Sequence, residues 1–141
     1  MFYISIYEYI TSFINIKACI VNNKIKKGKT MKKYLFYGMT GEKMCFQHIL
    51  MNAVDLSEKG YEVKIIFEGA SVKLVPVFEE EKTPIYVKAK EKGLIAGVCF
   101  ACTKVMNVYD EVVKSELELI NDMMGHAGIA RYADEYEVIS M

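Results

Sequence analysis

Residues 94–102 read Leu94-Ile95-Ala96-Gly97-Val98-Cys99-Phe100-Ala101-Cys102, an apolar run that ends in two cysteines. A stretch with helical spacing, residues 103–115, follows directly. The pattern predicts a buried strand over 94–99 that leads into a helix, with Cys99 and Cys102 at the junction. In open α/β sheets the carboxyl ends of the strands form the usual binding edge, so both thiols are expected at that edge.

The chain from Met31 onward alternates between short apolar runs and stretches with helical spacing. The apolar runs predict strands over 34–37, 61–67, 94–99, 117–121 and 136–139, and the stretches between them predict helices over 42–59, 70–80, 84–92, 103–115 and 125–135. Strands that alternate with helices predict an α/β fold with a parallel sheet covered on both faces. Right-handed crossovers then bring every strand-to-helix turn to one edge of the sheet.

Composition limits the classes to which this chain can belong. It has 141 residues, enough for one domain, of which 52% are hydrophobic and 26% charged, as is typical of globular proteins. Its 18 basic residues balance 18 acidic ones, which gives no electrostatic reason to expect nucleic acid as a partner. No apolar run reaches the roughly 18 residues that span a bilayer, so no membrane partner is expected. Four cysteines are too few for a secreted disulfide scaffold, which favours a cytoplasmic protein with reduced thiols.

The first thirty residues differ from the rest. Residues 1–21 are rich in Ile, Tyr and Phe, whereas residues 22–30 are polar and basic. A signal peptide carries its positive charge before its apolar region, and here that order is reversed. Lys-Lys-Gly-Lys-Thr, just before Met31, can be encoded by a ribosome-binding site. We therefore predict that Met31 is the true start and that residues 1–30 are a non-native or disordered extension; a genuine extension, such as a loose or interfacial helix, is the alternative.

The candidate catalytic residues are Cys99, Cys102 and His126. The thiolate is the reactive form of cysteine, and a helix N-terminus lowers the pKa of a thiol, which favours Cys102 because it opens the expected helix. His126 could act as a base near neutral pH or serve only as a turn residue. The alternative for both thiols is that they are small buried hydrophobic side chains.

The same three side chains could also bind zinc, with or without Cys45 as a fourth ligand. A Cys-x-x-Cys spacing fits half of a zinc site, and His126 could supply a further ligand. The spacing also occurs in thiol–disulfide proteins. Other residues at the expected edge are candidates for binding a small ligand or an anion at the turns, namely Gly38, Thr40, Gly41, Cys45, Gly69 and Asp122.

Five short motifs follow one another along residues 31–141. They are Gly-Met-Thr-Gly at 38–41, Ile-Ile-Phe-Glu-Gly-Ala at 65–70, Gly-Leu-Ile-Ala-Gly-Val-Cys-Phe-Ala-Cys at 93–102, Asn-Asp-Met-Met-Gly-His at 121–126 and Tyr-Glu-Val-Ile at 136–139. In this order they resemble the DsrE/DsrF-like (DsrEFH-like) family of small sulfur-relay proteins. The resemblance implies a three-layer α/β/α sandwich with a mostly parallel five-stranded sheet, and assembly as a homo-oligomer, such as a trimer or hexamer. In sulfur-transferring members a cysteine after the third strand carries a persulfide, a role that would fall to Cys99 or Cys102.

The sequence therefore favours a DsrE-like sulfur-handling protein. It would accept sulfane sulfur as a persulfide from a donor protein and pass it to an acceptor protein, without a cofactor. The first alternative is a non-catalytic oligomeric module that binds zinc or a small ligand on the same fold. The second is a thiol–disulfide protein that uses Cys99 and Cys102.

Overall fold

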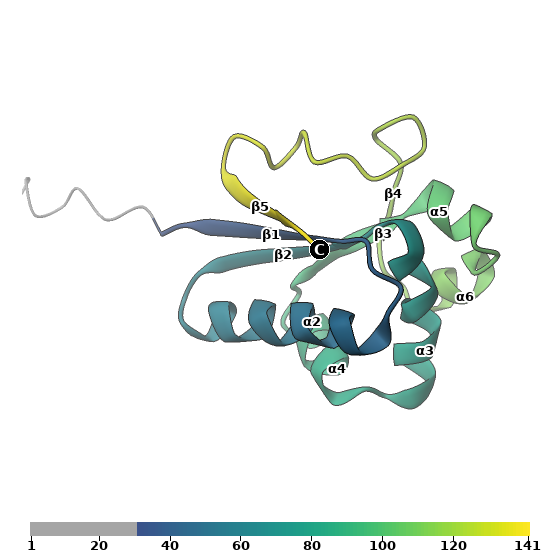
Figure 1. The fold of residues 1–141 in the computed structure, drawn as a ribbon, viewed down its shortest axis with the longest axis horizontal. Helices are drawn as coiled ribbons and strands as arrows, with labels where there is room; N and C mark the ends of the chain where they lie inside the picture. The colour runs from purple at the N-terminus through teal and green to yellow at the C-terminus, as the bar shows by residue number, and fades with distance from the viewer. Residues whose placement is uncertain (1–30) are drawn as a thin grey trace, which may run out of the picture. The chain divides into compact units, whose positions relative to one another are not determined.

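The computed structural model describes residues 31–141, and the predicted extension over residues 1–30 lies outside the described residues (Figure 1). Its sheet has the strand order β4-β3-β2-β1-β5, and all neighbouring strands are parallel. The strands are β1 (Lys33–Gly38), β2 (Glu62–Phe67), β3 (Ile95–Cys99), β4 (Leu119–Ile120) and β5 (Tyr136–Ser140). The predicted α/β fold with a five-stranded parallel sheet is confirmed.

Helices cover one face of this sheet (Figure 1). They are α2 (Lys43–Glu58), α3 (Leu74–Glu81) and α4 (Pro84–Glu91), and a 3₁₀ helix, η1 (Gly69–Lys73), precedes α3. The helices α5 (Phe100–Val105) and α6 (Tyr109–Lys114) follow β3. The crossovers from β1 to β2 and from β2 to β3 step in the same direction across the sheet. Because right-handed crossovers in one direction place their helices on the same side, α2, α3 and α4 share a face.

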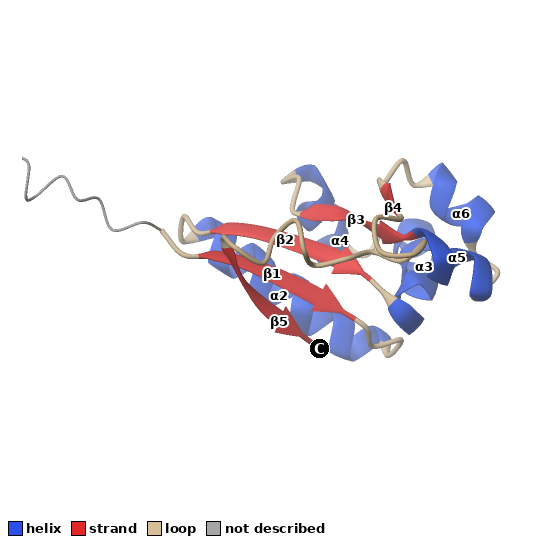
Figure 2. Cartoon of the chain, turned by 90° about the horizontal axis from the view of Figure 1, so that it is seen from above, coloured by secondary structure: helices blue, strands red, loops and turns tan. Residues whose placement is uncertain are grey.

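The connection from β4 to β5 must return across the sheet, because β5 pairs with β1 at the opposite edge. Residues 121–135 make this return along the face opposite the helices (Figures 1 and 2). The Tyr37 hydroxyl donates a hydrogen bond of 2.7 Å to the Ala127 carbonyl, and the rings of Tyr132 and Tyr136 meet edge to face at 5.2 Å. This segment therefore forms the layer over the second face.

The helix predicted over residues 125–135 is wrong, because this segment consists of turns. Met124 and Gly125 have positive φ values of 52° and 90°, which no right-handed helix contains. The helix predicted over 103–115 is also wrong, since it divides into α5 and α6 around Asn107, whose φ is 55°. The helix predicted over 70–80 begins instead as η1, ahead of Pro76.

The hydrophobic core lies between the helices and the sheet. The rings of Phe46 and Phe67 stack at 4.3 Å, and those of Phe78 and Tyr86 stack at 5.4 Å, all of them buried. The Tyr86 hydroxyl reaches Glu79 at 2.7 Å, which satisfies its one polar atom. Within residues 31–141, no helix has both the length and the apolar character that crossing a membrane requires.

We predict that Gly97→Ala destabilises the protein by about 1–3 kcal/mol, because the added methyl group overpacks the β3–β4 contact. A Cβ at Gly97 would lie 2.7 Å from the Glu118 carbonyl oxygen and 2.7 Å from side-chain carbons of Ile120. Gly93→Asn is the matched control: Gly93 has a φ of 67° and no atom within 4 Å of an added Cβ. Asn tolerates this backbone conformation, so the control should change stability by less than about 0.5 kcal/mol. Urea unfolding of both variants measures the difference, and equal stabilities would contradict the prediction.

Candidate functional site

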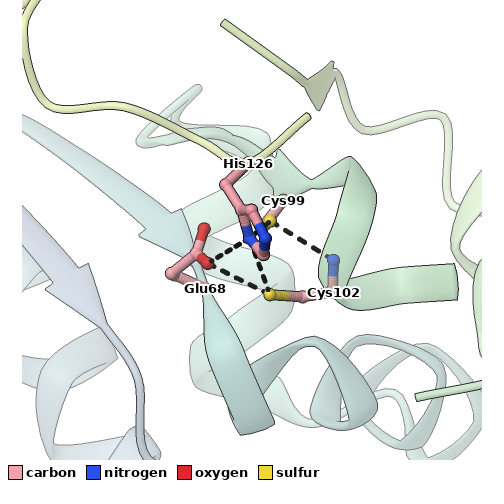
Figure 3. Close-up of side chains that lie close together, drawn as sticks. All are labelled: Glu68, Cys99, Cys102 and His126. Atoms are coloured by element: carbon pink, nitrogen blue, oxygen red, sulfur yellow. Dashed lines mark hydrogen bonds and ion pairs between the residues drawn. The ribbon is translucent and has the colours of Figure 1, made fainter. Parts of the chain in front are cut away.

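Four side chains converge at the carboxyl edge of the sheet (Figure 3). Glu68 directly follows β2, Cys99 ends β3, Cys102 lies in the first turn of α5, and His126 follows β4. One ligand atom from each side chain lies within 4.8 Å of those from the other three. Of the four, Glu68, Cys99 and Cys102 are buried and His126 is partly exposed.

Three contacts of this cluster converge on the Nδ1 atom of His126. This atom lies 3.3 Å from Cys99 Sγ, 3.5 Å from Cys102 Sγ and 3.2 Å from Glu68 Oε1. Cys102 Sγ in turn lies 3.0 Å from Glu68 Oε1. Three partners therefore meet a single ring nitrogen, which offers one proton or one lone pair at a time.

The turn from β3 into α5 positions both sulfurs. Helix α5 begins at Phe100, three residues earlier than the spacing predicts, so Cys99 is its N-cap residue. Cys99 Sγ accepts a hydrogen bond of 3.4 Å from the amide of Cys102. Because residues three apart in a helical turn lie on the same side, the two thiols point into one space.

A two-residue hairpin positions His126. The amides of Met123 and His126 each donate to the carbonyl of the other residue, at 2.9 Å and 2.8 Å. The residues between them, Met124 and Gly125, both have positive φ, as a type I′ turn requires. The Gly125 carbonyl also accepts a hydrogen bond of 2.9 Å from the Ala101 amide, which ties the hairpin to α5 and holds His126 over the two sulfurs.

Burial and hydrogen bonding fix the protonation of the cluster in the metal-free protein. Burial alone would raise the pKa of Glu68, but hydrogen bonds from Cys102, Cys99, His126 and the Ala127 amide lower it overall. Burial and the neighbouring Glu68 raise the pKa of the Cys102 thiol to about 12. Burial likewise raises the pKa of Cys99. Without a cation, Glu68 is therefore a carboxylate and both sulfurs are neutral thiols, which are poor nucleophiles.

This geometry does not match a cysteine–histidine–acid catalytic triad. Such a triad uses both ring nitrogens, one toward the nucleophile and the other toward the acid. Here the two sulfurs and the carboxylate all approach Nδ1. The group of two cysteines, one histidine and one glutamate could instead bind a metal ion, since each supplies an accepted metal-ligand atom to the same small space.

The cluster brings together the three predicted catalytic residues, Cys99, Cys102 and His126. Gly69 lies beside it, and its amide, directed at the Cys102 sulfur, lowers the pKa of that thiol against the larger effect of burial. Asp122 lies outside the cluster and holds the following turn, because its carboxylate accepts the Gly128 amide at 2.7 Å and binds Arg131.

The predicted ligand-binding turn at residues 38–41 contributes no side chain to the cluster, although the Gly38 carbonyl accepts the Glu68 amide at 2.9 Å. The amides of Met39 and Thr40 donate to the main-chain oxygen of Met141, at 2.6 Å and 3.3 Å. Thr40 Oγ1 accepts the Glu42 amide, and Gly38 and Gly41 pack closely against Phe46 and Ala70. Cys45 is exposed on α2 and does not join the two buried cysteines. A ligand at this turn stays a prediction.

Glu68 is the one member of the cluster that the sequence did not single out. It follows the apolar residues Ile65-Ile66-Phe67 directly, at the carboxyl end of a buried strand. The rule that identified the two cysteines, a polar side chain just after a buried strand, applies equally to Glu68.

Comparison with known proteins finds a clear relative. An uncharacterized protein of Methanocaldococcus jannaschii, MJ0733, is 38% identical over 98 residues, which cover 67% of this chain and 78% of the relative. The chain belongs to the MJ0733 family. No protein-family model matches the chain, and no solved structure matches it. Membership of the MJ0733 family therefore brings no known activity, and function must be argued from the cluster.

We predict that alkylation distinguishes the cysteines of the metal-free, reduced protein. Cys45 is exposed, whereas Cys99 is fully buried and Cys102 is 7% exposed. With iodoacetamide at neutral pH, Cys99 and Cys102 should react at least about tenfold more slowly than Cys45, because only the thiolate reacts. The rate at Cys102 should rise as the pH increases toward its pKa of about 12. Peptide mapping by mass spectrometry measures each rate, and equal rates at Cys102 and Cys45 at neutral pH would contradict the prediction.

Proposed function

We propose that this protein binds one zinc ion through Glu68, Cys99, Cys102 and His126. The observation that carries this proposal is the approach of two sulfurs and a carboxylate to the same histidine nitrogen. One hydrogen bond can satisfy only one of these three contacts. A cation at the centre of the four atoms satisfies all of them, because each then directs a lone pair at the ion.

The distances between the two sulfurs and the histidine nitrogen fit a tetrahedral ion. Zinc lies about 2.0–2.3 Å from nitrogen, oxygen and sulfur ligands, so neighbouring ligand atoms of a tetrahedral site lie about 3.3–3.8 Å apart. His126 Nδ1 lies 3.3 Å from Cys99 Sγ and 3.5 Å from Cys102 Sγ, within this range. Glu68 Oε1 lies closer, at 3.2 Å from Nδ1 and 3.0 Å from Cys102 Sγ, so its carboxylate would shift slightly outward to bind the ion. Two sulfurs, an imidazole and one carboxylate favour zinc over the all-oxygen ions magnesium and calcium.

Main-chain amides around the cluster donate hydrogen bonds that stabilise negatively charged ligand atoms. The Cys102 amide donates to Cys99 Sγ at 3.4 Å, and the Ala127 amide donates to Glu68 Oε2 at 3.4 Å. Donors of this kind orient metal ligands and stabilise the charge of thiolates and carboxylates. A bound cation would also reverse the effect of burial on the two cysteines, because a coordinated thiol loses its proton.

Four ligands from the protein complete a tetrahedron, which is typical of a structural zinc site. This site would join the carboxyl ends of β2 and β3 to the hairpin that follows β4. The bound metal would thereby hold residues 121–135, which contain no helix or long strand, against the edge of the sheet. Metal binding and the folding of this segment are then coupled.

We predict that protein purified without chelator, or reconstituted with zinc, contains one zinc ion per chain. Cys99→Ser, Cys102→Ser, His126→Ala and Glu68→Gln should each weaken binding, the cysteine variants by at least about a hundredfold, since a neutral hydroxyl replaces a thiolate. Elemental analysis and competition with a chromogenic chelator measure zinc content and affinity. Cobalt substitution adds a thiolate-to-metal absorption band that both cysteine variants should lower.

Cys45→Ser is the matched control, because it removes an exposed thiol outside the cluster and should retain full zinc content. Removing zinc with a chelator should lower the Tm of the wild-type protein, by an amount that grows with zinc affinity. A zinc-free wild-type protein that binds no added zinc would contradict the proposal, as would equal binding by the Cys102→Ser variant.

We propose sulfur transfer as the second candidate function. The position of Cys102 supports this function. Cys102 is the less buried of the two thiols at the turn after β3, and the resemblance to DsrE/DsrF-like proteins implies that a cysteine there carries the persulfide. In that reaction the Cys102 thiolate attacks the outer sulfur of a donor's persulfide and forms a Cys102 persulfide, while the donor leaves as a thiolate. Cytoplasmic donor and acceptor proteins, and assembly as a trimer or hexamer, belong to this proposal. Sulfur transfer ranks second because the raised pKa of Cys102 disfavours the thiolate that the reaction needs.

If this protein carries sulfur, incubating the metal-free, reduced form with thiosulfate or a small persulfide should add one sulfur atom that a reductant removes. The gain should disappear in Cys102→Ser and persist in Cys45→Ser, as measured by intact mass spectrometry. No gain in the wild-type protein, or a gain confined to Cys45, would rule out sulfur transfer at this site and leave zinc binding untouched.

A further inference from the structure

We infer that the cluster is a redox switch, in which oxidation by a peroxide joins Cys99 to Cys102 and releases the metal. This inference rests on the proposed zinc site and assigns its regulation. It needs two conditions that zinc binding alone does not, namely that the two sulfurs can bond to each other and that an oxidant can reach one of them.

The backbone meets the first condition. Cys99 is the N-cap residue of α5 and Cys102 lies three residues later, in the first turn. In a helical turn, Cα atoms three residues apart lie about 5 Å from each other, and disulfides join residues whose Cα atoms are about 4.4–6.8 Å apart. The two sulfurs already face the same space, within 4.8 Å of each other. A disulfide therefore needs small side-chain rotations and no rearrangement of the strand or helix.

Solvent access meets the second condition and makes the two cysteines unequal. Cys99 is 0% exposed and Cys102 is 7% exposed. The side chain of His126 is 42% exposed, so solvent reaches the cluster on the histidine side. A molecule as small as hydrogen peroxide can reach Cys102 first, and Cys99 then lies behind it as the second thiol.

The chemistry balances with hydrogen peroxide as the oxidant. The Cys102 thiolate attacks one peroxide oxygen, the O–O bond breaks, and hydroxide leaves, which gives a sulfenic acid at Cys102. The Cys99 thiolate then attacks the Cys102 sulfur, the S–O bond breaks, and a second hydroxide leaves. Two protons convert both hydroxides to water. In total the two thiolates lose two electrons, and one peroxide molecule gains them.

Disulfide formation removes two of the four ligands, and a disulfide sulfur carries no charge with which to hold zinc. Glu68 and His126 alone are a weak pair. The metal therefore leaves, and the hairpin that carries His126 loses its link through the metal, although the hydrogen bond from the Ala101 amide to the Gly125 carbonyl remains. This hairpin holds Met124, a fully exposed residue in a left-handed conformation, so it has little packing of its own. Oxidation should loosen residues 121–135 and leave the helical face of the sheet unchanged.

The experiment uses the full chain with Cys19→Ser and Cys45→Ser, loaded with zinc and treated with increasing hydrogen peroxide. The expected result is one zinc released per chain, read by a chromogenic chelator. Released zinc should match the loss of two hydrogen atoms in intact mass, and non-reducing peptide maps should contain a Cys99–Cys102 cross-link. A dithiol reductant with added zinc should restore the loaded form. Hydrogen exchange of residues 121–135 should accelerate on oxidation while that of α2 stays constant.

Cys99→Asp is the matched variant, because it retains a negatively charged ligand but removes the second sulfur. It should form sulfenic or sulfinic acid at Cys102 and no cross-link. The peptide map of the Cys19→Ser, Cys45→Ser chain does not need Cys99→Asp, so it tests the inference even if Cys99→Asp does not fold. Zinc that stays bound, or that leaves with sulfinic acids in place of the cross-link, would overturn the switch while zinc binding stands. A protein that takes up no zinc before oxidation would overturn the proposed site itself.

Discussion

The parallel order of the strands is the constraint on which the rest of this structure depends. Because β2, β3 and β4 lie side by side and point the same way, their carboxyl ends meet at one edge. Because β5 pairs on the far side of β1, the chain must cross the second face after β4. The first consequence brings Glu68 beside the two cysteines, and the second carries His126 over them. No short-range sequence motif could assemble these four side chains.

Burial determines the charge states of the side chains at this edge. Glu68 is 5% exposed and remains a carboxylate because thiols and amides donate to it. The same burial holds the pKa of both thiols above the ordinary range, so in the metal-free protein they are neutral. An unpaired charge in a buried site is costly, and a cation reverses the balance by stabilising the carboxylate and both thiolates together. Zinc binding and sulfur transfer therefore both require the Cys102 thiolate, but only zinc binding brings the cation that stabilises it.

The proposals give the cluster at this edge three states. With zinc, the cluster ties the turns of residues 121–135 to the sheet. Without zinc, the side chains that remain are two protonated thiols and a carboxylate beside a half-exposed histidine. A disulfide between Cys99 and Cys102 would be a third state, in which neither sulfur can act as a ligand or accept sulfur. Exchange between these states would act on the hairpin at Met123–His126, in which Met124 is fully exposed.

Local patterns in the chain predict most of the fold. The alternation of apolar runs with helical spacing predicts all five strands and the helices α2, α3 and α4, since apolar residues recur in them with the period of a strand or of a helix. The segment 125–135 departs from this pattern, because the positive φ values of Met124 and Gly125 serve a tight turn that holds His126 against α5. Cys99, Cys102 and His126 are recognisable from residue type and spacing. The role of Glu68 follows from strand pairing, since it lies 31 positions before Cys99 and 58 before His126 in the chain. All four side chains reach one point because residues 121–135 cross the second face of the sheet and because the site is buried. Both are properties of the folded chain.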